Sequence, residues 1–145
     1  MKVSFDFDST LERKDIQEYA KTLVKRGVDV WIVTSRYSDE MIKKKFKGKA
    51  QYSLLSNRDL INAARYVGIP MTNIKFMNFS EKYTFIKDMD FIFHLDDDPF
   101  ELEQVQAYTD TIPVDSWQEN WRRDCENALE HVIKSLHKSL RKKTK

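Results

Sequence analysis

Four short groups of polar residues stand out because carboxylate, hydroxyl and ammonium groups directly follow or lie between apolar stretches of sequence. They are Asp6-Phe7-Asp8-Ser9-Thr10, Thr34-Ser35-Arg36, Lys82 and Asp96-Asp97-Asp98. Carboxylate oxygens are ligands that Mg²⁺ prefers, and hydroxyl and ammonium groups can hold the oxygens of an anion. Each group alone also has a structural explanation, since Asp, Ser and Thr commonly cap helices or close turns after a strand. A shared chemical role requires that the four groups meet in space.

Five short apolar runs, rich in Val, Ile or Phe, predict the strands that would bring these groups together. They cover residues 2–7, 28–33, 74–78, 91–95 and 111–114. Their nearly continuous apolar character is typical of strands that are covered on both faces.

Amphipathic stretches between the runs predict helices with recognisable ends. The first helix ends at Gly27, because glycine accepts the left-handed conformation that follows many helices. The second follows Ser38. The third begins with a capping box of Ser56 and Asp59 and ends at Gly68.

Three further helices complete the pattern. One begins near Ser80 and buries Phe85, Ile86 and Met89, and a short one has Asp98 as its N-cap and Pro99 in its first turn. The last helix carries an apolar stripe that predicts core packing. Its members are Trp117, Trp121, Cys125, Ala128, Leu129, Val132, Ile133, Leu136 and Leu140.

The alternation of strands and helices predicts an α/β domain with a parallel sheet, right-handed crossovers and helices on both faces. In such sheets the functional site lies beyond the carboxyl ends of the strands. The four polar groups stand at or near those ends, so an acid, a hydroxyl, an ammonium and a second acid are expected along one edge of the sheet.

At this point the sequence resembles the haloacid dehalogenase-like (HAD) superfamily, whose members are mostly Mg²⁺-dependent phosphohydrolases. Its four motifs occur in order. They are Asp-x-Asp-x-Thr at Asp6, Asp8 and Thr10, the strand-terminal Thr34, the lysine Lys82, and the paired acids Asp96 and Asp97. The resemblance spans residues 2 to 99 and implies a Rossmann-like sheet of five strands in the order 5-4-1-2-3.

The resemblance also implies a role for each residue. Asp6 would be the nucleophile that becomes an aspartyl phosphate, and Asp8 the general acid and then the general base. A Mg²⁺ ion would be held by Asp6, the backbone carbonyl of Asp8, and the Asp96/Asp97 pair, with Asp96 slightly favoured as the direct ligand. Phosphoryl oxygens would be held by Thr34 and Lys82, with Ser35 and Arg36 as further phosphate-binding residues.

Three departures from the family pattern shape the expected substrate. Ser9 stands where many members have glycine, a helix follows Thr10 almost at once, and no interval between the motifs is long enough for a cap domain. Capless members of the family tend to act on large substrates such as phosphoproteins or nucleic-acid ends, or oligomerise to cover the site. For this chain we expect a nucleic-acid end, a nucleotide or a small phosphorylated metabolite as the substrate. Arg36 would suit a second phosphate, because guanidinium groups bind phosphate bidentately, although a plain surface charge is an equal alternative.

Length and composition place these residues in one domain. The 145 residues fit a single hydrophobic core, and 33% charged residues with no long apolar run argue against a membrane protein. Asp6 and Asp8 interrupt the apolar start, so no signal peptide is expected. The lone Cys125 permits no internal disulfide, which suits a reducing cytoplasm.

The net charge of +2 conceals a basic C-terminal segment. Residues 131–145 hold six Lys or Arg side chains and no acid, as a helix end or tail, and a second basic run covers Lys43–Lys49. Such runs are usually solvated faces, and contact with nucleic acid is the less common alternative.

Two other functional classes stay open. The first is a catalytically weak module that binds metal and phosphate or nucleic acid, which the intact Asp6 and Asp8 argue against. The second is a receiver-like signalling domain, but its phosphorylated acid would follow the third strand, where this chain has Asn78.

Overall fold

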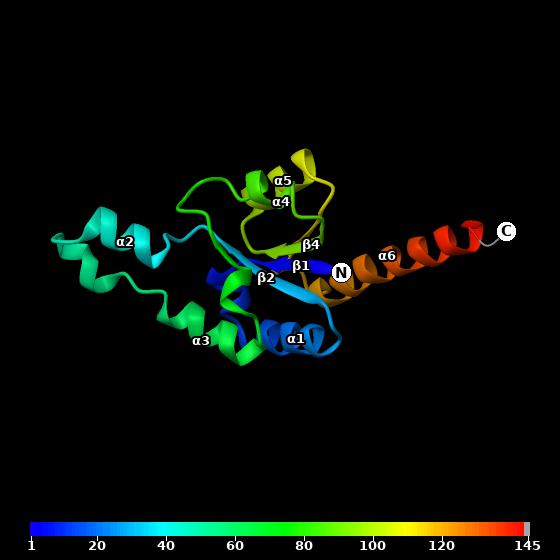
Figure 1. Cartoon of the computed structure of the whole chain (residues 1–145), viewed down its shortest axis with the longest axis horizontal. Helices are drawn as coiled ribbons and strands as arrows, with labels where there is room; N and C mark the ends of the chain where they lie inside the picture. The colour runs from blue at the N-terminus through cyan, green and yellow to red at the C-terminus, as the bar shows by residue number, and fades with distance from the viewer. Residues whose placement is uncertain (144–145) are drawn as a thin grey trace.

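Five short strands form one parallel sheet in the computed structural model, which describes residues 1–143 (Figure 1). The strands are β1 (Lys2–Phe5), β2 (Asp29–Thr34), β3 (Ile74–Phe76), β4 (Phe91–Asp96) and β5 (Ile112–Asp115). Their spatial order is β3-β2-β1-β4-β5. Read from the other edge this is 5-4-1-2-3, so the predicted α/β fold class and strand order are confirmed.

Helices cover both faces of the sheet (Figure 1). They are α1 (Lys14–Lys25), α2 (Asp39–Phe46), α3 (Arg58–Val67), α4 (Tyr83–Ile86), α5 (Pro99–Tyr108) and α6 (Trp121–Lys143), with short turns η1 (Phe7–Leu11), η2 (Ala50–Leu54) and η3 (Met71–Asn73). Among residues 1–143, none of these helices combines the length and the apolar character that a membrane crossing demands.

Alternate residues of the strands face two separate apolar clusters, as the two-residue period of a strand requires. Val30 and Ile32 of β2 pack with α1, α3 and α6. Trp31 and Val33 face the other way and pack with α4 and α5. The sheet is therefore buried on both faces, and its polar residues are confined to the strand ends and a few interior positions.

Most of the predicted helix ends are confirmed. Gly27 and Gly68 have φ angles of 83° and 97°, the left-handed conformation expected after a helix. Ser38 and Asp98 each accept a hydrogen bond from a backbone N–H of the helix that follows. The fourth helix is shorter than predicted, since α4 starts at Tyr83 and leaves Lys82 as its N-cap.

The predicted capping box at Ser56 and Asp59 is wrong. The N-cap of α3 is Asn57, and Ser56 Oγ accepts from the backbone N–H of Arg58 at 3.1 Å. The Asp59 carboxylate forms an ion pair with Arg36 in place of the predicted capping contact.

The stripe predicted for the last helix is buried only over its first turns. Trp121, Cys125, Ala128 and Leu129 lie in the core, and Cys125 is a free thiol. Trp117 precedes α6 and is 67% exposed, while Leu136 and Leu140 are 54% and 60% exposed, so their predicted core packing is wrong. The physical reason is length: 23 residues of helix span about 35 Å, and the outer turns extend past the sheet (Figure 1).

The basic C-terminal segment is thus a helix end as far as Lys143, while the predicted basic residue Lys145 lies outside the described residues. Figure 1 places the C-terminal turns of α6 and the helix α2 at opposite ends of the molecule. The segment from residue 36 to 57, which contains α2 and η2, projects beyond the carboxyl end of β2, and we call it the α2 lobe.

Candidate functional site

The first and fourth strands bring two acids side by side. β1 and β4 are parallel neighbours in which Phe5 pairs with Leu95, and the backbone N–H of Asp6 donates to Leu95 O at 2.8 Å. Asp6 and Asp96 therefore follow directly at the same edge of the sheet. Both carboxylates are buried, with relative exposures of 6% and 0%.

Lys82 lies between these two acids. Its Nζ donates to Asp6 Oδ1 and to Asp96 Oδ2, both at 2.8 Å, and the side chain is buried. A buried ammonium is costly unless it is paired, and here it is paired twice. The structure thus brings together three of the sequence-predicted site residues.

A buried histidine extends this cluster into the sheet, and the sequence analysis missed it. His94 Nε2 lies 2.8 Å from Asp96 Oδ2, and Nδ1 lies 2.8 Å from Ser4 Oγ. His94 and Ser4 are cross-strand partners between β4 and β1, and neither has exposed surface. The signal was available, because His94 and Asp96 stand two residues apart in an otherwise apolar strand and must share one face of it.

The surroundings shift the pKa values of Asp6 and Asp96 in opposite directions. Burial and the neighbouring Asp96 charge raise the pKa of Asp6 well above its usual range, against the opposing effect of Lys82. Burial also disfavours the charged form of Asp96, but the contacts with His94 and Lys82 outweigh it and lower the pKa of that carboxyl. Burial lowers the pKa of His94, and the paired carboxylates overcome burial and raise the pKa of Lys82.

Three carboxylates form a cluster that could hold a metal ion. One oxygen from each of Asp6, Asp96 and Asp97 lies within 4.8 Å of the other two. An all-oxygen donor set suits a hard cation such as Mg²⁺, so the residues fit the cofactor that the sequence predicts.

The environment of the acids bears on which one would be the direct ligand. Asp96 Oδ2 contacts Lys82 and His94, and Asp96 Oδ1 accepts the backbone N–H of Asp98 at 3.1 Å. Asp97 is half-buried, and its Oδ1 accepts a hydrogen bond from Thr10 Oγ1 at 3.2 Å. The contacts therefore favour Asp97 over Asp96 as the more available ligand, whereas the sequence analysis slightly favoured Asp96.

Asp8 lines a cavity together with Asp6, Lys82, Asp96 and Asp97, but its carboxylate forms an ion pair with Arg36. Its two carboxylate oxygens accept from Arg36 at 2.7 Å and 3.0 Å, and the side chain is 54% exposed. Arg36 also donates to both oxygens of Asp59 and to the carbonyl of Ser56, so the guanidinium makes five hydrogen bonds. A phosphate-binding role for Arg36 stays a prediction, which would require this group to exchange partners.

The remaining predicted residues are placed around the cavity, which has a volume of about 220 Å³. Ser35 lines it, whereas Thr34 is buried at the end of β2 and its Oγ1 accepts the backbone N–H of Arg36 at 3.2 Å. The complete lining consists of Asp6, Asp8, Ser9, Ser35, Lys82, Asp96, Asp97 and Asp98.

The turn above the cavity is strained at Ser9. This residue has a φ of 59°, in the left-handed region that glycine enters without the clash of a Cβ atom. Its backbone N–H donates to Glu12 Oε1 at 3.1 Å. The sequence departure from glycine at this position therefore leaves the turn in a conformation that favours glycine.

Comparison of the chain with models of protein families, with curated proteins and with solved structures gives no match.

Proposed function

We propose that the protein is a Mg²⁺-dependent phosphomonoester hydrolase of the HAD-like type that acts through a phosphorylated Asp6. The observation that supports this most strongly is the Asp6–Lys82–Asp96 cluster with Asp97 beside it, at the carboxyl edge of a parallel sheet. This arrangement combines a nucleophilic carboxylate, a cation that can hold phosphoryl oxygens, and oxygen ligands for a metal.

Asp6 is the group that attacks phosphorus. One of its carboxylate oxygens bonds to phosphorus while the bond to the leaving oxygen breaks, and that oxygen takes a proton from Asp8. Water then attacks phosphorus and gives a proton to Asp8, the bond to Asp6 breaks, and inorganic phosphate leaves. Lys82 stabilises the negative charge on Asp6 and on the transferred group, because its ammonium is already buried against the reacting carboxylate.

A Mg²⁺ ion bound by Asp6 and Asp97 with Asp96 would offset the repulsion between a carboxylate and a phosphate dianion. The raised pKa of Asp6, which holds although Lys82 is paired with it, favours the protonated carboxyl when no metal ion lies beside it. Ionisation of the nucleophile and binding of a cation are therefore coupled.

Asp8 can reach a leaving oxygen only when its pair with Arg36 opens, because both carboxylate oxygens accept from the guanidinium in this conformation. This contact also supports a second candidate, a catalytically weak module that binds metal and phosphate. The two candidates differ in turnover, since the weak module would bind a phosphorylated compound without releasing phosphate.

The test is release of 4-nitrophenol from 4-nitrophenyl phosphate with Mg²⁺, with EDTA, and with the Asp6→Asn variant. We expect turnover only with Mg²⁺ and only in the protein that retains Asp6. A thermal melt of Asp6→Asn provides the control, and it should show a folded protein because the substitution relieves crowding between buried acids. Full activity in metal-free buffer would refute the mechanism.

A further inference from the structure

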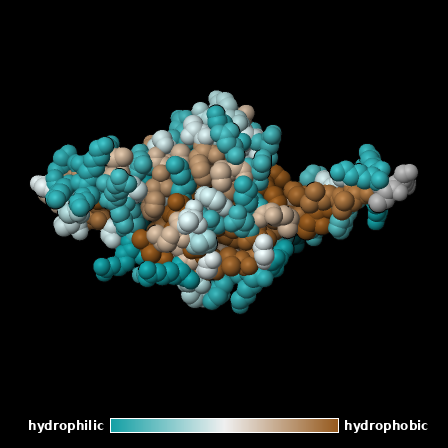
Figure 2. All heavy atoms as spheres, in the orientation of Figure 1, coloured by the Kyte–Doolittle hydropathy of each residue, from teal (hydrophilic) through white to brown (hydrophobic). Residues whose placement is uncertain are grey.

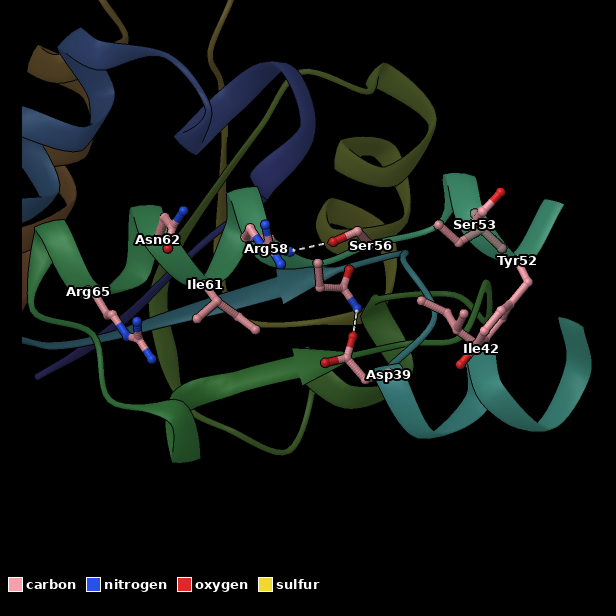
Figure 3. A pocket seen from close by; sticks show the side chains of 11 residues that line it. Asp39, Ile42, Tyr52, Ser53, Ser56, Arg58, Ile61, Asn62 and Arg65 are labelled. Carbon is pink, nitrogen blue, oxygen red and sulfur yellow. Dashed lines mark hydrogen bonds between the residues drawn. The ribbon is translucent and has the colours of Figure 1, made fainter. Parts of the chain in front are cut away.

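A second cavity lies beside the proposed catalytic site, between the α2 lobe and helix α3 (Figure 3). Its volume is about 730 Å³, and its polar and apolar lining comes from α2, from η2 and its following loop, and from α3. Nothing in the proposed reaction uses this cavity.

The α3 wall of the cavity presents two arginines. Arg58, Asn62 and Arg65 follow one another at spacings of four and three residues, so they share one face of the helix. All three are exposed. Within residues 1–143, neither arginine side chain is engaged in an ion pair or a hydrogen bond, so both guanidinium groups are available to an anionic ligand.

This cavity adjoins the catalytic site by way of Arg36, although the two cavities share no lining residue. Ser56, Arg58 and Asn62 also line a neighbouring hollow that contains Arg36. Arg36 in turn donates to Asp8, which lines the catalytic cavity. A ligand with one phosphate at Asp6 could therefore extend past Arg36 toward Arg58 and Arg65.

The α2 lobe, which forms one wall of the cavity, also carries a positive net charge. Residues 36–57 hold six basic and two acidic side chains, a net charge of +4, whereas the whole chain has +2. Lys43, Lys44, Lys45, Lys47 and Lys49 are all exposed, and Figure 2 shows a largely hydrophilic surface at this end of the molecule. The charge points to an extended anionic ligand.

Exposed aromatic rings accompany the positive charge. Tyr52 is 40% exposed on the cavity wall. Phe79 is 67% exposed in an adjoining hollow that also contains Arg36, and it packs on Tyr37 with ring centroids 4.7 Å apart. A positively charged groove with aromatic rings is how proteins hold single-stranded nucleic acids, because bases stack on the rings while cations follow the phosphates. An acidic peptide would use the charges but leave the rings without a partner.

We propose that the cavity between the α2 lobe and α3, which we call the groove, binds single-stranded nucleic acid and directs its phosphorylated end to Asp6. This assignment rests on the proposed function for the identity of the reaction, but the binding of the strand is a separate property. The phosphates that follow the terminal one would contact Arg58 and Arg65, and the bases would stack against Phe79 or Tyr52.

The experiment compares the double variant Arg58→Ala/Arg65→Ala with a control of equal charge change, Lys25→Ala/Arg123→Ala, whose residues are exposed on α1 and α6. Binding of a fluorescent single-stranded DNA without a terminal phosphate is measured over a range of salt concentrations. Such a strand cannot be hydrolysed, so the readout is independent of catalysis. kcat/KM is measured in parallel for the 3′- and 5′-phosphorylated strands and for 4-nitrophenyl phosphate.

We expect the groove variant to bind the strand more weakly, with a slope of log affinity against log salt that is shallower by about 1.4, the loss of two phosphate contacts. Its kcat/KM should fall for a phosphorylated strand and stay unchanged for 4-nitrophenyl phosphate. The control variant should match the unmodified protein in every assay.

Equal strand binding by the two double variants would overturn the proposal, and so would binding of poly-glutamate as tightly as DNA. A loss of strand binding confined to the groove variant, with no phosphate release from any substrate, would leave the groove assignment standing and refute the phosphatase proposal instead. Phosphate release together with strand binding that does not depend on Arg58 and Arg65 would refute the groove assignment and leave the phosphatase proposal standing.

Discussion

Lys82 is the residue on which the ionisation of the site depends. Its ammonium lies 2.8 Å from carboxylate oxygens of both Asp6 and Asp96, in a place where none of the three is appreciably exposed. Without this charge, two acids would face each other in a medium that screens them poorly. Lys82 thus has a structural role in the free protein and, by our proposal, a catalytic one with substrate.

Replacing Lys82 with alanine should therefore reduce both stability and activity. We expect a loss of about 3–5 kcal/mol in the free energy of unfolding at neutral pH, the cost of leaving a buried charge without its partner. The matched control is Lys87→Ala, because Lys87 is exposed just beyond α4, and its effect should stay within about 0.5 kcal/mol. Urea unfolding and phosphate release measure the two effects, and equal effects of the two substitutions would show that Lys82 has been misassigned.

The Arg36–Asp59 pair is a second contact with a measurable signature. Hydrogen bonds from Arg36 lower the pKa of Asp59 below its usual value of 3.8, although its side chain is 53% exposed. A lowered pKa in the folded state means that the pair stabilises the protein at higher pH, and that this contribution is lost as the pH falls through the lowered value.

Asp59→Asn should lower the free energy of unfolding by at most about 1 kcal/mol at neutral pH, since the pair is partly solvated. The difference from the unmodified protein should be complete above the usual pKa of 3.8 and should disappear as the pH falls through the lowered pKa of Asp59 in the folded protein. Asp88→Asn, at an exposed acid, is the control in the same pH series of urea unfolding curves. A difference that grows toward acid pH would contradict the assignment of this pair.

At the scale of elements, the sequence was most informative where burial acts on both faces. The five strands were predicted because short, nearly continuous apolar runs are typical of strands covered on both faces, and Gly68 marked the end of α3 because glycine accepts the left-handed conformation that follows many helices. The apolar stripe of α6 gave a wrong prediction of core packing at its C-terminal end. Its helical period continues to that end, but Leu136 and Leu140 are exposed, because no strand extends beneath them.

The site was predictable in part for the same reason. Asp6, Lys82 and Asp96 could be placed at one edge because strand ends are shared by a parallel sheet. The partners of Arg36 could not be predicted, since Asp59 lies 23 residues away on another element and its position suggested a helix cap. The sequence can therefore predict which residues lie at one edge of the sheet. It cannot predict which side chains from different elements pair with one another there.

The basic end of α6 offers a prediction at this scale. Because its last turns and the α2 lobe lie at opposite ends of the molecule (Figure 1), deletion of residues 141–145 should not change the ratio of activities on a phosphorylated strand and on 4-nitrophenyl phosphate. That ratio is measured at low and at physiological salt. A ratio that falls on deletion at low salt would show that α6, rather than the α2 lobe, holds the strand.

At the scale of the whole molecule, two unlike charge environments meet at the carboxyl edge of the sheet. The cavity that we propose to be catalytic is lined by five acids and one lysine, and the adjoining α2 lobe has a net charge of +4. The acids suit a metal and a reacting carboxylate, and the lobe suits the rest of an anionic substrate. Arg36 lies between them, paired with acids on both sides.

The central claim, that Asp6 carries the phosphoryl group, is tested most directly by chemical trapping. The Asp8→Asn variant, which lacks the base for the second step, is mixed with Mg²⁺ and 4-nitrophenyl phosphate, quenched with acid and treated with borohydride, which reduces an aspartyl phosphate to homoserine. Mass spectrometry of the N-terminal peptide should find homoserine at position 6 and aspartate at the other acidic positions. Phosphate release by the unmodified protein, with residue 6 still aspartate in the trapped variant or with homoserine at another position, would contradict the account.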